Sequence, residues 1–217
     1  MTVDEQEERP GAQEWVPQSR AVEDLRDAAR GCRGCELWRD ATQTVFSAGA
    51  EGASMMLVGE QPGDREDRTG EPFVGPAGRM LDDALDEAGI ERDEVYLTNA
   101  VKHFRFEPRG KRRIHEKPST GHVVACRPWL EAEVAAVGPR VIVAMGATAA
   151  RSVLGRPVKI GEVRGSEIDA SDWPDMAVLV TVHPSSLLRL RDDADRHSAF
   201  RAFVADLHAA AELAGTA

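Results

Sequence analysis

The sequence predicts an α/β protein, built as a three-layer α/β/α sandwich around a central four-stranded parallel sheet. Four short apolar runs alternate along the chain with longer segments of helical periodicity. Each run is apolar throughout, which is typical of strands that are buried on both faces of a parallel sheet. The 217 residues are enough for one such domain with a sizeable core.

The first half of the chain contains two predicted helices and two predicted strands. Residues 21–30 have the periodicity of a short amphipathic helix. Residues 55–58 form an apolar run that ends in a turn rich in glycine and proline, which indicates a buried strand. Residues 76–88 begin with proline, carry one apolar face and stop at glycine, so we expect a helix. Residues 95–98 form the second strand and end at Asn99.

The second half continues the alternation. Residues 122–137 are predicted to be a helix, and the apolar run 141–145 is predicted to be the third strand. A helix over 147–154, a fourth strand over 178–182 and a terminal helix over 199–213 complete the pattern. No G-x-G-x-x-G motif follows the first strand, which disfavours a dinucleotide site.

The remaining segments are irregular. Residues 1–18 lack apolar periodicity and are predicted to be a disordered acidic tail, which leaves residues 19–217 as a single domain. Residues 156–175 have room for a short extra strand. No apolar stretch approaches the length of a membrane span, and residues 1–14 lack the apolar core of a signal peptide. We therefore expect a monomeric, cytoplasmic protein.

Charge is distributed unevenly along the chain. The net charge is −10 and the isoelectric point is about 5.1, which by themselves argue against a nucleic-acid partner. Because salt screens charges beyond about 10 Å, a local basic patch can still attract phosphates. Residues 102–117 form such a patch, with two glutamates and seven basic residues: Lys102, Arg105, Arg109, Lys111, Arg112, Arg113 and Lys117.

Polar groups follow three of the four predicted strands. Glu60 and Gln61 follow the first strand, Asn99 ends the second, and His183 follows the fourth. The carboxyl ends of parallel strands lie at one edge of the sheet, where such proteins present their reactive groups. The basic loop Lys111-Arg112-Arg113-Ile114-His115 adds a nucleophilic imidazole among positive charges. Together these features predict chemistry on a nucleic-acid base.

Four motifs resemble those of the iron–sulfur uracil-DNA glycosylases and occur in the same order. The basic loop and Gln61 resemble one branch of that family, UdgX. The resemblance implies a uracil-DNA glycosylase that accepts single-stranded DNA and stays covalently linked to the abasic site through His115. The motifs are Gly-Glu-Gln-Pro-Gly at 59–63, Gly-Glu-Pro-Phe-Val-Gly-Pro-Ala-Gly-Arg at 70–79, Thr-Asn-Ala-Val-Lys at 98–102 and His-Pro-Ser at 183–185.

Three cysteines are too few for a disulfide framework and make a metal site plausible. Cys32 and Cys35 have C-x2-C spacing, which lets two thiolates reach one metal centre, and Cys126 supplies a third. The related glycosylases carry a cysteine just after the Thr-Asn-x-Val-Lys motif, and this alignment makes His103 the predicted fourth ligand. Such a set suits zinc or an iron–sulfur cluster, and the resemblance favours [4Fe–4S].

The resemblance also suggests a uracil pocket. Phe73 is the expected stacking surface, and the amide of Asn99 can both accept from and donate to the imide edge of uracil. His183 is expected to stabilise the negative charge on the departing base. Gly59 is expected to be part of the substrate-binding pocket, and Ser185 is expected to contact uracil or a phosphate.

Two hypotheses differ in what attacks the sugar after the base has left. Glu60 and Gln61 are expected to line the site, with Glu60 stabilising the cationic sugar or orienting a nucleophile. That nucleophile is His115 in a self-trapping enzyme and water in a turnover enzyme. Lys111, Arg112 and Arg113 are expected to hold phosphates. A third hypothesis is a non-catalytic DNA-binding module stabilised by a metal, which would have no need for the acidic, amide and imidazole groups together.

Overall fold

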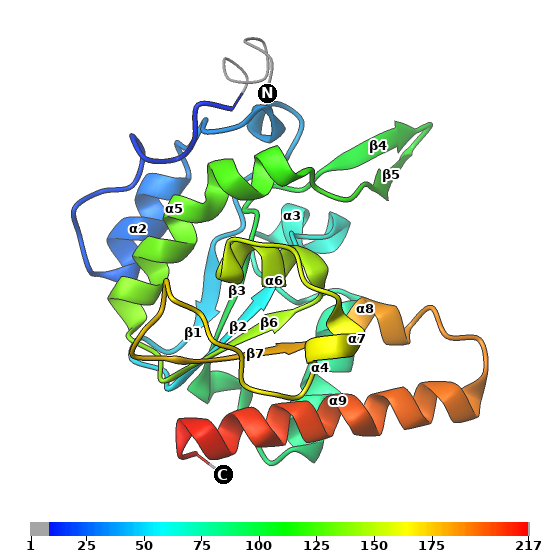
Figure 1. The fold of residues 1–217 in the computed structure, drawn as a ribbon. Coiled ribbons are helices and arrows are strands. Elements are labelled where there is room, and N and C mark those ends of the chain that lie inside the picture. Colours follow the sequence, from blue (N-terminus) through cyan, green and yellow to red (C-terminus); the bar gives the residue numbers. More distant parts are fainter. Residues whose placement is uncertain (1–8, 217) are drawn as a thin grey trace.

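The computed structural model describes residues 9–216, which form a mostly parallel five-stranded sheet enclosed by helices (Figure 1). The strand order is β1-β3-β2-β6-β7, and β2 pairs in parallel with both β3 and β6. Strand β7 extends the parallel part beyond β6. The strands are β1 (Ser47–Gly49), β2 (Met55–Gly59), β3 (Val95–Asn99), β6 (Val141–Met145) and β7 (Ala177–Thr181).

The four predicted strands are present and pair in parallel, but the predicted four-stranded sheet is incomplete. Strand β1 is a fifth member and runs antiparallel to β3, with Ser47 opposite Thr98. Its three residues are too short for a periodic signal. Gly49 ends β1 with φ of 99°, and a side chain there would collide with the carbonyl group of Val95.

Two apolar clusters fill the space between the sheet and its two helical layers. Alternate residues of each central strand enter opposite clusters, as Met56 and Leu57 do on β2. This explains why the strand sequences are apolar throughout. One layer contains α2 (Val22–Ala29), α5 (Thr120–Val137) and α6 (Ala147–Leu154), and the other contains α4 (Pro76–Glu87), α8 (Pro184–Leu187) and α9 (Asp193–Ala214).

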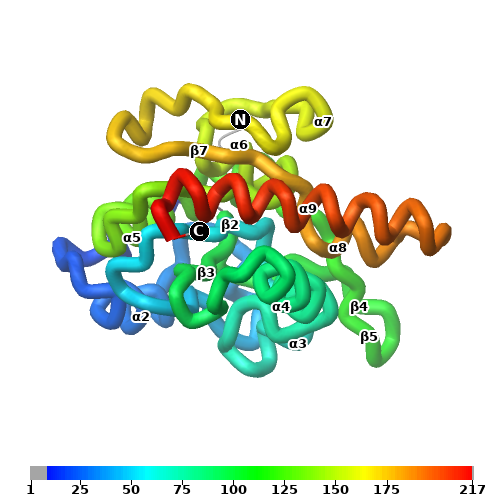
Figure 2. The backbone as a smooth tube through the Cα atoms, turned by 90° about the horizontal axis from the view of Figure 1, so that it is seen from below, coloured from blue at the N-terminus to red at the C-terminus, as the bar shows by residue number. Residues whose placement is uncertain are grey.

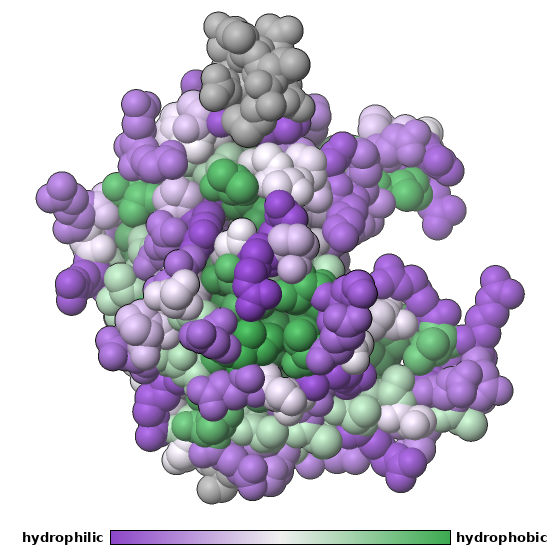
Figure 3. All heavy atoms as spheres, viewed as in Figure 1, coloured by the Kyte–Doolittle hydropathy of each residue, from purple (hydrophilic) through white to green (hydrophobic). Residues whose placement is uncertain are grey.

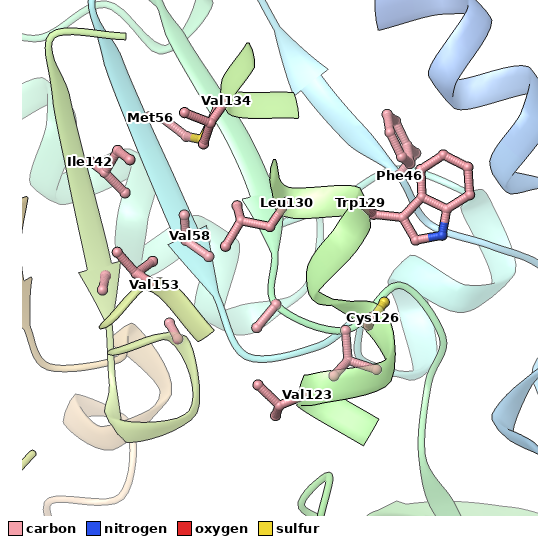
Figure 4. Close-up of a cluster of buried hydrophobic side chains, with 14 of the residues drawn as sticks. Phe46, Met56, Val58, Val123, Cys126, Trp129, Leu130, Val134, Ile142 and Val153 are labelled. Atoms are coloured by element: carbon pink, nitrogen blue, oxygen red, sulfur yellow. The ribbon is translucent and has the colours of Figure 1, made fainter. Parts of the chain in front are cut away.

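Figure 2 shows the helices that cover one face of the sheet, and Figure 4 shows side chains of the cluster on the other face. In Figure 2, helix α9 crosses the underside of the molecule, where it packs beside α4. Figure 4 shows the opposite cluster, in which Trp129 and Cys126 of α5 lie near Phe46. The rings of Phe46 and Trp129 meet edge to face at 5.6 Å, a favourable arrangement for aromatic pairs.

The basic segment, predicted to be a loop, is a β-hairpin of β4 (Phe106–Arg109) and β5 (Arg112–His115). Arg109 pairs with Arg112, which leaves a two-residue turn at Gly110 and Lys111. Gly110 has φ of 60°, the left-handed conformation that a tight two-residue turn needs. The hairpin projects from the body of the molecule in Figures 1 and 2 and carries His115 at its base, opposite Phe106.

The N-terminal prediction needs correction where the structure describes it. Residues 9–18 were expected to be disordered, yet Ala12 is fully buried and its amide donates to Ala125 at 2.8 Å. Arg9 forms an ion pair with Glu36. This segment is polar in sequence because only a few of its residues face the core, so it has no periodicity to detect. The rest of the predicted tail, residues 1–8, lies outside the described residues.

Other connections are short elements. Residues 156–175 contain α7 (Ile160–Val163) and only isolated bridges, Arg164 to Val180 and Glu167 to Leu179, in place of the expected extra strand. Among the described residues, no helix is long and apolar enough to cross a membrane. The other short helices are α3 (Asp64–Thr69), η1 (Glu36–Arg39) and η2 (Arg92–Glu94).

Candidate active site

A cleft of about 1010 Å³ opens where the central strands end, between the hairpin and α8. Figure 3 shows this opening as a notch between the projecting hairpin and the opposite rim of the molecule. The structure therefore gathers groups that follow three different strands, as the parallel sheet predicts. Seven predicted site residues line the cleft: Glu60, Gln61, Phe73, Asn99, His115, His183 and Ser185.

His115 and Glu60 face each other in this cleft. The imidazole Nε2 of His115 lies 3.5 Å from a carboxylate oxygen of Glu60, and about half of the His115 side chain is exposed. The second oxygen of Glu60 accepts a hydrogen bond from the hydroxyl of Thr148 at the start of α6. The carboxylate is thus fixed from one side and free to orient an imidazole on the other.

Gln61 fastens the hairpin instead of facing a substrate with its amide. Its nitrogen donates to the carbonyl groups of Arg105 and Glu116, each at 3.1 Å, and its oxygen accepts from the amide of Arg105 at 3.1 Å. Arg105 and Glu116 immediately flank the two strands of the hairpin. Gln61 was predicted to be catalytic, and these bonds show that it also positions the base of the hairpin that carries His115.

Arg113, which was predicted to hold a phosphate, is the second anchor of the hairpin. Its guanidinium pairs with Asp64 at 2.5 Å and Asp67 at 2.6 Å, and only 16% of the side chain is exposed. It also stacks on the rings of Phe104 and Phe106. Because two carboxylates already neutralise it, Arg113 binds the hairpin to α3 and has little charge left for DNA.

The basic patch is therefore weaker than its sequence suggests. Lys102 pairs with Glu133, Arg105 with Glu116, and Arg109 with Glu107. With Arg113 also paired, three of the seven basic side chains have no ion pair among residues 9–216: Lys111, Arg112 and Lys117. Lys111 and Arg112 are exposed at the tip of the hairpin, where they are available to phosphates.

One wall of the cleft is formed by Phe73 and Asn99. Gly59 lies behind them and contacts both. Phe73 adopts a left-handed conformation with φ of 57°, which is costly for a large side chain and typical of a functional position. Asn99 is 2% exposed, and its amide makes no hydrogen bond with the other described residues. A side chain at Gly59 would lie 2.6 Å from the Phe73 ring and collide with the Asn99 amide, so glycine lets these two groups approach each other.

His183 and Ser185 form the opposite wall. The backbone amide of Ser185 donates to Nδ1 of His183 at 3.2 Å, and the Ser185 hydroxyl lies 2.9 Å from the same atom. A proton on His183 therefore belongs on Nε2. Desolvation lowers the pKa of His183 to about 4, so the ring is a neutral donor at neutral pH. Ser185, predicted to bind uracil or a phosphate, lines the cleft and also orients His183.

The three cysteines are buried in the same apolar cluster and are free of disulfides. Two of their sulfurs accept hydrogen bonds: Cys32 from the Trp129 indole at 3.3 Å, and Cys126 from the Lys102 amide at 3.4 Å. Burial raises the pKa of Cys35 to about 11. Buried sulfurs that accept N–H donors have the chemistry of iron–sulfur ligands.

His103 does not join the cysteines through its Nε2 atom. That atom lies 3.0 Å from the hydroxyl of Thr44, and burial lowers the pKa of His103 to about 4. Within the described part of the chain, no three Cys, His, Asp or Glu side chains are arranged to hold a single metal ion.

The sequence analysis does not predict three residues that contribute to the site. Thr148 holds Glu60 and comes just after β6, so the strand-end rule that found Asn99 also applies to it. Asp64 and Asp67 bind Arg113 and lie on one face of α3, three residues apart. In the sequence, they are marked only by their place: Asp64 directly follows the Gly-Glu-Gln-Pro-Gly motif, and Asp67 comes three residues later.

Comparisons with known proteins agree with this geometry. The model of the uracil DNA glycosylase superfamily matches residues 46–208. The type-4 uracil-DNA glycosylase of Thermotoga maritima is 38% identical over 174 residues, which cover 79% of this chain and 85% of that protein. The type-4 enzyme of Sulfurisphaera tokodaii is 32% identical, with 77% and 76% covered, and that of Archaeoglobus fulgidus is 34% identical, with 77% and 84% covered. This chain therefore belongs to the uracil DNA glycosylase superfamily.

Proposed function

We propose that this protein is a uracil-DNA glycosylase that excises uracil and then becomes covalently linked to the abasic site through His115. The glycosylase activity is supported by the similarity to type-4 uracil-DNA glycosylases. The observation that carries the covalent step is the 3.5 Å approach of the His115 imidazole to Glu60 inside the cleft. The substrate is uracil in DNA, single strands included, and the working unit is a monomer.

Excision begins when the flipped base enters the cleft between Phe73 and His183. These rings are inclined by 27°, with centroids 6.5 Å apart. The free amide of Asn99 pairs with the imide edge of uracil, where cytosine has a different donor pattern. As the bond between the sugar C1′ and uracil N1 breaks, its electron pair leaves with the base. The Nε2 proton of neutral His183 stabilises the resulting charge on a uracil oxygen.

Attachment follows when His115 attacks the cationic sugar. A lone pair of the neutral imidazole forms the new C–N bond at C1′, and the ring then loses its remaining proton to Glu60 or to solvent. Anchored groups reach effective molarities of about 10⁵–10⁸ M, which exceeds any concentration of water. Gln61 and Arg113 provide that anchoring, because they fix both ends of the hairpin and one of its faces.

The test is a denaturing gel of the protein incubated with a single-stranded oligonucleotide that contains one uracil, beside a thymine control. We expect a band, stable to heat and detergent, that appears only with uracil. An unshifted strand that breaks in alkali would support the alternative, a turnover glycosylase in which water replaces His115. Binding with neither product would support a non-catalytic DNA-binding module, although the convergence of Glu60, Asn99 and His183 speaks against it.

Asn99→Ala should reduce uracil excision strongly without unfolding the protein. The variant removes the amide that reads uracil, while β3 keeps its backbone hydrogen bonds on both sides. Single-turnover excision and thermal melting measure the two properties separately. Equal excision rates in the variant and in the wild type would remove Asn99 from the proposed pocket.

The cofactor of this enzyme is proposed to be a [4Fe–4S] cluster held by Cys32, Cys35, Cys126 and His103. The support is the resemblance and the three buried sulfurs with their N–H donors. A cluster is larger than a single ion, so its ligands stand further apart than zinc ligands do. His103 would bind the metal through Nδ1, while its Nε2 keeps the contact with Thr44. The role is structural, because these residues join the N-terminal segment to α5.

Purified protein is therefore expected to be brown, with broad visible absorbance and stoichiometric iron and sulfide. Cys126→Ser should remove most of this absorbance and lower the melting temperature, since Cys126 lies in the apolar core. Iron analysis and visible spectra of both proteins are the measurements. Colourless wild-type protein with one equivalent of zinc would replace the proposed cluster with a zinc site.

A further inference from the structure

A second, smaller hollow of about 180 Å³ lies beside the cleft and shares Lys117 and Ala147 with it. Thr148, whose hydroxyl holds Glu60, lines this groove as well. The groove therefore begins where the active-site cleft ends. Its walls come from the start of α5, from α6 and from two prolines that stiffen the segments around it: Lys117, Pro118, Thr120, Val123, Ala147, Thr148, Arg151, Pro157 and Val158.

The groove is positively charged. It is lined by two cations, Lys117 and Arg151, and by no aspartate or glutamate. Neither cation has an ion pair or hydrogen bond from its side chain within residues 9–216. This contrasts with the hairpin, where Arg105, Arg109 and Arg113 are all paired with acidic residues. On a protein of net charge −10, two uncompensated cations in one concave surface form a local anion site.

We propose that this groove binds a backbone phosphate of the DNA strand that flanks the flipped nucleotide. The inference rests on the proposed function, because it takes DNA as the ligand. Arg151 can donate two parallel hydrogen bonds to a phosphate, and Lys117 supplies a point charge at the junction with the cleft. The hydroxyl group of Thr120 lines the same surface and can donate as well. The strand thus leaves the active site along α6, on the side of the cleft opposite α8.

Arg151→Ala is expected to weaken binding to single-stranded DNA several-fold and to reduce its salt dependence. Each phosphate contact that is lost lowers the slope of log K against log salt by about 0.7. The probe is a fluorescent oligonucleotide with thymine in place of uracil, so that no excision interferes. Arg201→Ala is the matched control, because Arg201 is an exposed arginine of α9, in the opposite helical layer. It should leave both quantities unchanged.

A series of oligonucleotides, each with one neutral methylphosphonate, identifies the phosphate. One position near the target should weaken wild-type binding as much as Arg151→Ala does, and it should cause no further loss in that variant. Equal affinities and salt slopes for Arg151→Ala, Lys117→Ala and the Arg201→Ala control would overturn the proposal. The denaturing gel with the uracil-containing strand tests the proposed function separately from the proposed phosphate site. A variant that binds DNA weakly but still reacts at saturating DNA leaves the proposed function intact. A wild-type protein that binds DNA through Arg151 but never reacts refutes only the function.

Discussion

His115→Ala is expected to abolish covalent attachment to uracil-containing DNA while uracil release continues. The groups assigned to bond cleavage, Asn99 and His183, lie on other elements and stay in place. Removal of the imidazole leaves room for water beside Glu60, whose carboxylate is still held by Thr148. The variant should therefore produce abasic sites that break in alkali, and a denaturing gel should contain no shifted band.

The size of this effect follows from the hairpin. A flexible histidine would compete poorly with water, but His115 sits on a strand that Gln61 and Arg113 anchor. His197→Ala is a matched control, because His197 is an exposed histidine on α9. The control should attach at the wild-type rate. A shifted band with His115→Ala would mean that another nucleophile forms the bond, and peptide mapping of the product would then identify it.

The strand-end residues could be predicted because a parallel sheet brings them together regardless of loop structure. Glu60, Asn99 and His183 lie at the ends of three strands, and the sequence predicts that they share one site. The same logic failed for β1, which is three residues long and antiparallel. A short strand is defined by its partner, and that pairing leaves no mark on local periodicity.

The roles of charged residues were harder to predict, because charge partners are distant in sequence. Arg113 lies 46 residues from Asp67 and 49 from Asp64, so the basic run gave no indication that this cation was neutralised. Conversely, Arg151 is the one basic residue of α6 and belongs to no basic run in the sequence, yet the fold brings it beside the cleft. A count of basic residues along the chain is thus a poor guide to where a phosphate binds.

Lys102→Met is expected to lower the free energy of unfolding by about 3–5 kcal/mol, the usual cost of stranding one member of a buried ion pair. The Lys102 ammonium lies 2.5 Å from Glu133, and these side chains are 1% and 0% exposed. The Glu133 carboxylate also accepts hydrogen bonds from Thr98 at 2.8 Å and Tyr96 at 3.1 Å. Burial raises the pKa of Glu133, and without Lys102 the carboxyl group would take up a proton or remain as an unpaired charge.

A rescue variant shows whether the missing charge causes the loss. In Lys102→Met/Glu133→Gln, a neutral amide oxygen still accepts from Thr98 and Tyr96, so much of the lost stability should return. Denaturant melts of the wild type, both single variants and the double variant give the coupling energy. The contrary result is additivity, in which Glu133→Gln lowers the free energy of unfolding by the same amount in the Lys102→Met variant as in the wild type. The two residues would then act independently, and loss of the ion pair would not explain the lower stability of Lys102→Met. The Glu133 carboxylate of this pair also accepts from Thr98 of β3, just before Asn99, so coupled loss should slow uracil excision. The backbone amide of residue 102 keeps its bond to Cys126 in every variant.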